Sequence, residues 1–108
     1  MPTVNLSRLA AKSGSSDALQ FAPDETTPSL LDGEVFVTGV NTKATAITNF
    51  TDAEAGIVYT IYGNGSENAS TIASGWNFVL TEAITLSEGK FIKLAKAADG
   101  KFYEVARG

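Results

Sequence analysis

From Gly33 to the end of the chain, apolar and polar residues alternate in short runs, and this alternation restricts the fold more than any other feature. A period of two places every second side chain on one face of a pleated strand, so the pattern is typical of half-buried β-strands. The run at residues 57–62 is the strongest, because every position is β-branched or aromatic. We predict eight strands, over residues 34–38, 45–50, 57–62, 69–73, 77–80, 83–86, 91–94 and 102–105.

Turns centred on glycine separate these runs, because Gly adopts a positive φ at little cost. Gly63-Asn64-Gly65 is interpreted as a hairpin turn, and Ala97–Gly100 as the loop of a hairpin between the last two strands. Thr51–Ala55 is the one helix candidate of this region, a single turn that Gly56 could end. Many short strands with regular turn signals predict an all-β fold, a small jelly-roll-like β-sandwich over residues 33–108.

The first 32 residues have a different composition. They contain all three prolines and the serine-rich Ser13–Ser16, with one short helical turn expected near Leu6–Ala10. Yet they are too apolar for a solvated tail, so we predict an extended N-terminal arm, residues 1–32, that contacts another subunit or a capsid. The alternative is that the arm lies back over its own domain. The candidate contact residues are Val4, Leu6, Leu9, Leu19 and Phe21.

The composition excludes several function classes. The chain contains no Cys and no His, which excludes Ser-His-Asp and Cys-His catalysis, zinc or haem sites built on these residues, and disulfides. A net charge of −4 argues against nucleic acid, because phosphate binding depends on Lys and Arg. The N-terminus lacks a signal-peptide pattern, and no apolar run approaches the ~18 residues of a membrane span. We expect no cofactor, no metal, and neither nucleic acid nor membrane as a partner.

The acidic residues are the remaining candidates for catalysis. Asp52 and Glu54 share one loop, and Glu82 and Glu88 flank one strand. A glycan-cleaving enzyme needs two carboxylates across a cleft, one with its pKa raised by burial. These acids lie among turn and surface residues, so we expect them to be solvated and predict no catalytic residue. Gly63–Ser66 also lacks the lysine and the following helix of a phosphate-binding loop.

Three aromatic residues are candidates for a binding surface. Tyr59, Tyr62 and Trp76 could form a sugar-binding platform, because flat aromatic faces stack against sugar rings. Aromatic residues on strands more often belong to a core or a subunit interface. Both interpretations stay open on the sequence alone.

Several runs after residue 40 together resemble a known group of proteins. They are Ala46–Phe50, Ala55–Ile61, Ser70–Ile72, Asn77–Leu80, Gly89–Leu94 and Gly100–Arg107. The pattern is a Gly before an apolar strand, a Thr-Ile strand, an Asn-x-x-Leu strand, a Gly-led strand and a closing aromatic-Tyr-Glu-x-x-Arg. It is similar to the small β-modules of tailed-bacteriophage fibres and of head-fibre or capsid decoration proteins.

The resemblance implies a non-enzymatic virion protein, made in the host cytoplasm and exposed on the capsid surface. Its implied partners are the major capsid protein or another virion protein, and further copies of itself in a homotrimer. A short arm with one β-module resembles a head decoration or head-fibre protein more than a full tail fibre. The alternative is a carbohydrate- or receptor-binding module of a phage fibre that uses Trp76, Tyr59 and Tyr62.

Overall fold

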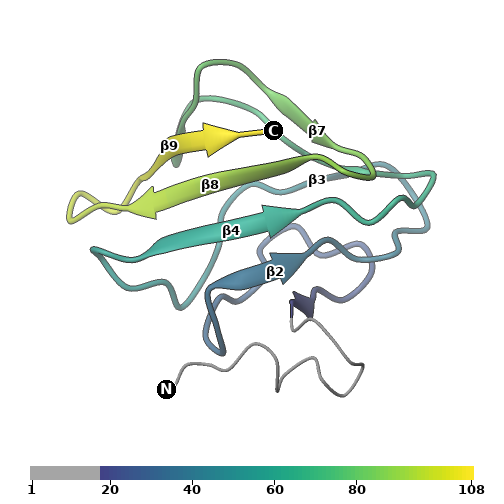
Figure 1. The fold of residues 1–108 in the computed structure, drawn as a ribbon, viewed down its shortest axis with the longest axis horizontal. Helices are drawn as coiled ribbons and strands as arrows, with labels where there is room; N and C mark the ends of the chain where they lie inside the picture. Colours follow the sequence, from purple (N-terminus) through teal and green to yellow (C-terminus); the bar gives the residue numbers. More distant parts are fainter. Residues whose placement is uncertain (1–17) are drawn as a thin grey trace.

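The chain folds into two β-sheets packed as a sandwich, in a computed structural model that describes residues 18–108 (Figure 1). The six-stranded sheet has the order β1-β2-β4-β8-β9-β6, and the three-stranded sheet has the order β3-β5-β7. The described residues contain no helix. The strands are β1 (Leu19–Gln20), β2 (Val35–Val37), β3 (Thr45–Ala46), β4 (Val58–Tyr62), β5 (Ser70–Ile72), β6 (Phe78–Val79), β7 (Ile84–Leu86), β8 (Phe91–Lys96) and β9 (Phe102–Arg107).

From β2 to β8 the chain passes from one sheet to the other at every strand, which determines how neighbouring strands pair. Two strands that pair within a sheet can therefore be separated along the chain by a strand of the opposite sheet, and such a pair can run parallel. The parallel pairs of this kind are β2 with β4 and β3 with β5. Parallel pairing needs such long connections, which helices usually supply. Here the opposite sheet supplies them. The all-β sandwich is confirmed, while these parallel pairs differ from the antiparallel hairpins of a jelly roll.

The core lies between the two sheets and is largely aromatic. Phe50 touches both Phe78 and Phe102, with ring centroids 5.8 and 5.4 Å apart and edge-to-face geometry. Phe21 joins the cluster through Phe50, at a centroid distance of 5.9 Å, and stacks on Phe36 at 5.3 Å. Edge-to-face pairs add to the free energy of burial, because the ring edge is electropositive and the ring face electronegative. The apolar residues that surround these rings are Leu30, Ile47, Tyr59, Ile61, Ile72, Ile84, Leu86, Ile92 and Leu94.

The expected boundary at residue 33 is wrong for the second half of the arm. Residues 19–20 form β1, which pairs in parallel with β2, and Leu30 is 1% exposed in the core. Asp24 fastens the intervening loop, because its carboxylate accepts hydrogen bonds from the amide and hydroxyl of Thr42 at 2.8 and 2.7 Å. These contacts hold the pKa of the Asp24 carboxyl below its usual value. Residues 18–32 therefore belong to the β-module.

Two local predictions are also wrong. Thr51–Ala55 forms no helix: Thr51 pairs with Ser29 in an isolated bridge, and Asp52 has a φ of +64°. Gly63–Gly65 is not a hairpin turn, because β4 and β5 lie in different sheets. Gly63 is needed there for space, since a Cβ would lie 2.2 Å from the carbonyl oxygens of Leu86 and Ser87. The hairpin between β8 and β9 is confirmed.

Candidate functional site

The first candidate site is the side of the six-stranded sheet that faces away from the second sheet, called here the outer face. Along β4 and β8 the side chains alternate, so that Tyr59, Ile61 and Ile92 enter the core and their neighbours face outward. The strand register aligns the outward residues in rows across the sheet. The apolar members of the outer face are Val35, Val37, Val58, Tyr62, Val79, Phe91, Ala95 and Tyr103.

The outer face has little charge. Lys93 and Thr60 are paired at its centre, and Thr60 is 7% exposed. The aromatic rings of Tyr62 and Phe91 lie against each other with centroids 5.5 Å apart, yet Tyr62 keeps 40% of its surface exposed. An antiparallel or mixed sheet with one solvated side usually alternates apolar and polar residues. The outer face of this sheet is instead mostly apolar, apart from the central Thr60 and Lys93.

The second candidate site is the turn that carries Trp76. Gly75 and Phe78 exchange two backbone hydrogen bonds of 2.7 and 2.9 Å, which places Trp76 and Asn77 at the two central positions. Trp76 has a φ of +53° and is 94% exposed. A bulky residue rarely adopts a positive φ, and the first central position of such a turn favours Gly.

A groove of about 310 Å³ lies beside this turn. Its wall comes from β3 and the residues after it, from β5, and from the turn itself. Among residues 18–108, no charged side chain lines it; the lining residues are Ala46, Ile47, Thr48, Asn49, Thr71, Ala73, Ser74, Trp76, Asn77 and Phe78. Asn49 Oδ1 is buried and has no hydrogen-bond partner among these described residues. The groove thus combines one exposed aromatic ring with neutral polar groups.

The three aromatic candidates do not form one platform. Tyr59 is 3% exposed, and its hydroxyl accepts a hydrogen bond of 2.9 Å from the amide of Glu54, so it belongs to the core. Tyr62 belongs to the outer face, and Trp76 alone lines the groove. The three residues therefore form no shared platform, and Tyr59 follows the alternative interpretation, a residue of the core.

The sequence did not identify Asn49 as part of this site. It follows β3, whereas Ser74 and Asn77 follow β5, so only the folded arrangement of the two connections brings them together. No local signal marks Asn49.

The capsid-contact residues of the arm divide into two groups. Val4, Leu6 and Leu9 lie outside the described residues, so the interpretation of these three stays a prediction. Leu19 packs against the core, and Phe21 is 8% exposed within it. Both side chains are already used inside the domain, which corrects their assignment to a capsid contact.

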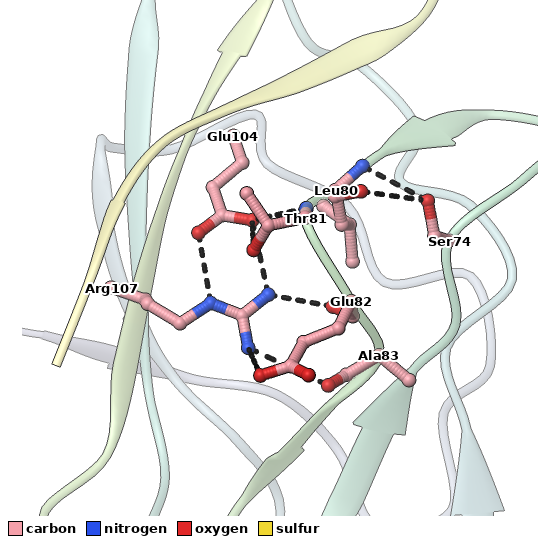
Figure 2. Close-up of polar contacts among 7 residues, drawn as sticks. All are labelled: Ser74, Leu80, Thr81, Glu82, Ala83, Glu104 and Arg107. Carbon is pink, nitrogen blue, oxygen red and sulfur yellow. Dashed lines mark hydrogen bonds and ion pairs between the residues drawn. The ribbon is translucent and has the colours of Figure 1, made fainter.

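A polar cluster joins β9 to the loop before β7 (Figure 2). Arg107 donates hydrogen bonds to the carbonyl oxygen of Glu82 at 2.6 Å and to the Glu104 carboxylate. The amide of Thr81 donates to the same carboxylate at 2.9 Å. The Arg107 guanidinium and Thr81 lower the pKa of Glu104 to about 2, and Glu104 raises the pKa of Arg107. A carboxylate held ionised by this many donors fastens the loop and is poorly suited to proton transfer.

The other acids lie apart. Ser29 Oγ donates a hydrogen bond of 2.6 Å to the exposed Asp52, and the Glu82 side chain is 78% exposed. Within residues 18–108, no three acidic residues gather where they could hold a metal ion. In the same range, no helix is long and apolar enough to span a membrane.

A scan against protein-family models and searches of curated proteins and of solved structures find no match to this chain. The function therefore has to be inferred from the residues themselves.

Proposed function

We propose that the chain is a non-enzymatic structural protein of a bacteriophage virion, a head decoration or head-fibre protein. The β-module assembles as a homotrimer on the capsid surface. The N-terminal segment attaches it to the major capsid protein or to another virion protein. Because Leu19 and Phe21 are already packed in the domain, this attachment is assigned to residues 1–17 and their Val4, Leu6 and Leu9.

The observation that carries the proposal is the apolar outer face. Val58, Val79 and Tyr103 are 41%, 42% and 38% exposed, and the register places them in one row with Ala95 between Val58 and Tyr103. Covering such a surface stabilises an assembly by about 25 cal/mol per Å² of apolar area removed from water. A small domain without disulfides or metals gains much from this burial.

The sheet edges favour association through the face instead of through an added strand. The two edge strands of the six-stranded sheet, β1 and β6, have only two residues each. So short an edge offers few free backbone groups to a neighbouring strand. Copies therefore meet through side chains of the outer face.

Light scattering on the full chain tests the assembly. We expect the mass of three chains for the native sequence and of one chain for Val58→Lys, because this substitution places a charge in the apolar row. Val40→Lys is the control: Val40 is 60% exposed and lies on no strand, so the variant makes the same charge change away from the outer face. A native chain that stays monomeric, or a Val58→Lys variant that stays trimeric, contradicts the proposed assembly.

A deletion tests the attachment. Removing residues 2–17 retains β1 and every core residue that the structure describes, so we expect a folded trimer that no longer binds capsids of the encoding phage. The full-length chain is the positive control, and circular dichroism checks the fold of the truncated one. Capsid binding that survives this deletion contradicts the role given to the N-terminal segment.

A further inference from the structure

Trp76 occupies a strained and solvent-exposed position that folding alone does not explain. It is 94% exposed, although it is the largest apolar side chain and the single tryptophan of the chain. Its φ of +53° lies in the left-handed region, which is unfavourable for a bulky side chain. Backbone strain of this kind is concentrated at functional sites, where it orients a side chain for a ligand.

Hydrogen bonds on both sides of Trp76 hold its turn, so the backbone position from which the indole extends is set before any ligand binds. Asn77 Nδ2 donates a hydrogen bond of 3.0 Å to the carbonyl oxygen of Thr48, which ties the turn to the segment after β3. Ser74 Oγ accepts from the amide of Leu80 at 3.0 Å and donates to its carbonyl oxygen at 3.1 Å (Figure 2). Two anchors on opposite sides of Trp76 reduce the entropy lost on binding.

The groove beside Trp76 determines which ligand chemistry fits. In the part of the chain that the structure describes, its walls contain amide and hydroxyl groups from Thr48, Asn49 and Ser74 but no charged side chain. The volume of about 310 Å³ is that of a small-molecule site. An aromatic face beside neutral donors and acceptors is complementary to a ring with both C–H and O–H groups.

We propose that this groove binds an uncharged pyranose unit of a glycan. One face of the sugar ring stacks on the indole of Trp76. The sugar hydroxyls exchange hydrogen bonds with the hydroxyl and amide groups that line the groove. The described lining contains neither Lys nor Arg, which disfavours anionic sugars, because their carboxylate or phosphate would find no counter-charge there. This inference does not depend on the proposed virion function, since the groove and the outer face use different residues.

Fluorescence of the native chain provides the first test. Because Trp76 is the only tryptophan, its emission reports on this site alone. We expect a saturable blue shift on titration with the methyl glycosides of glucose, galactose, mannose or N-acetylglucosamine, with half-saturation in the millimolar range. A glycan array that includes neutral and anionic bacterial surface polysaccharides then identifies the preferred sugar. No shift with any glycoside together with an empty array overturns the proposal, as does binding confined to anionic glycans.

Two variants distinguish a loss of sugar stacking on residue 76 from a loss of the fold. Trp76→Gly removes the ring and places the residue that the turn geometry prefers, so we expect an unchanged or higher unfolding temperature and at least a tenfold loss of affinity, measured by calorimetry. Trp76→Phe keeps an aromatic face and is expected to retain binding within about tenfold of the native chain. Full binding by Trp76→Gly, or its loss in a folded Trp76→Phe, contradicts the stacking role.

A second copy of the chain is the competing occupant. If it covers Trp76, the emission of the native chain shifts blue on raising the protein concentration without sugar, and the Trp76→Gly variant dissociates in light scattering. Either result overturns the proposal. We expect emission that is independent of protein concentration and the same mass for both proteins.

Discussion

Arg107 holds the carboxylate of Glu104, three residues earlier on β9, through two hydrogen bonds: Nε to Oε2 at 2.8 Å and Nη2 to Oε1 at 3.0 Å. Two parallel bonds between planar groups are stronger and more specific than a single contact between charges. Thr81 completes the set of donors, so the free carboxylate is the favoured form in the folded state.

This pair predicts a stability that depends on pH in the acidic range. The pKa of Glu104 falls from 4.5 to about 2 on folding, so the stabilisation is complete above pH 4.5 and is lost as the pH falls toward 2. Arg107 is a quarter exposed, and solvent screening reduces the effect to roughly 1–2 kcal/mol. Urea denaturation of the native chain and of Glu104→Gln at pH 7 and pH 2 measures it. We expect the variant to be less stable at pH 7 and to differ little at pH 2, where the Glu104 carboxyl is half protonated in the folded state. Glu82→Gln is the control, because Glu82 lies 3.9 Å from Arg107 with its side chain 78% exposed.

Phe21→Ala tests the inclusion of residues 18–32 in the β-module. Phe21 is 8% exposed and stacks on Phe36, so its truncation should lower the free energy of unfolding by about 3–5 kcal/mol. Leu31→Ala, in the same segment but at a side chain that is 69% exposed, should change it by less than about 0.5 kcal/mol. Chemical denaturation compares the two. Similar small effects of both substitutions would mean that this segment does not share the cooperative unit.

Gly63→Ala and Gly56→Ala distinguish two reasons for a glycine. At Gly63 the new methyl group would collide with the Leu86 carbonyl oxygen at 2.2 Å, so the backbone must move and we expect a loss of at least about 2 kcal/mol. At Gly56 no atom lies within 4 Å of the place that the methyl group would take, but the φ of +93° is unfavourable for alanine, by about 1 kcal/mol. Thermal unfolding should rank Gly63→Ala clearly below Gly56→Ala. The reverse order would contradict close packing of the crossover against β7.

The alternation of apolar and polar residues predicted well where the strands lie, but it predicted poorly which strands share a sheet. Period two is local, so β4, β7 and β8 lie where the sequence placed them. Which sheet a strand joins depends on contacts far along the chain, and no local pattern reveals that the chain changes sheet after each strand from β2 to β8. β1 was missed because two paired residues are too few to show a period.

The candidate sites also depend in part on contacts between distant residues, which the sequence does not reveal. Tyr59 and Tyr62 are three positions apart on one strand, so alternation already implies opposite faces and the shared platform could have been rejected from the sequence. The exposure of Trp76 follows from the register of its turn. Gly75 pairs with Phe78, so Trp76 takes a central position of the turn. That register depends on two anchors: Leu80, which closes the turn locally on Ser74, and Thr48, which lies on another part of the chain and holds Asn77.

Asn41→Ala should destabilise the domain more than its size suggests. The Asn41 side chain accepts from the amide of Asp24 at 2.8 Å and donates to the Asn68 carbonyl oxygen at 2.8 Å and to Ser70 Oγ at 3.0 Å. It therefore joins the segment before β2 to the start of β5, at a site only 6% exposed. Truncation leaves these partners without their bonds away from solvent, for which we expect a loss of about 2–4 kcal/mol.

Thr42→Val is the matched control for this prediction. It removes the exposed Thr42 hydroxyl bond to Asp24, while the amide of Thr42 still donates to the same carboxylate. The change should lower the free energy of unfolding by less than about 1 kcal/mol, because solvent can replace an exposed hydroxyl. Hydrogen exchange of the Asp24 amide adds a local measurement: Asn41→Ala should speed it strongly and Thr42→Val only slightly. Equal exchange rates in both variants would contradict the role of Asn41 in holding the two segments together.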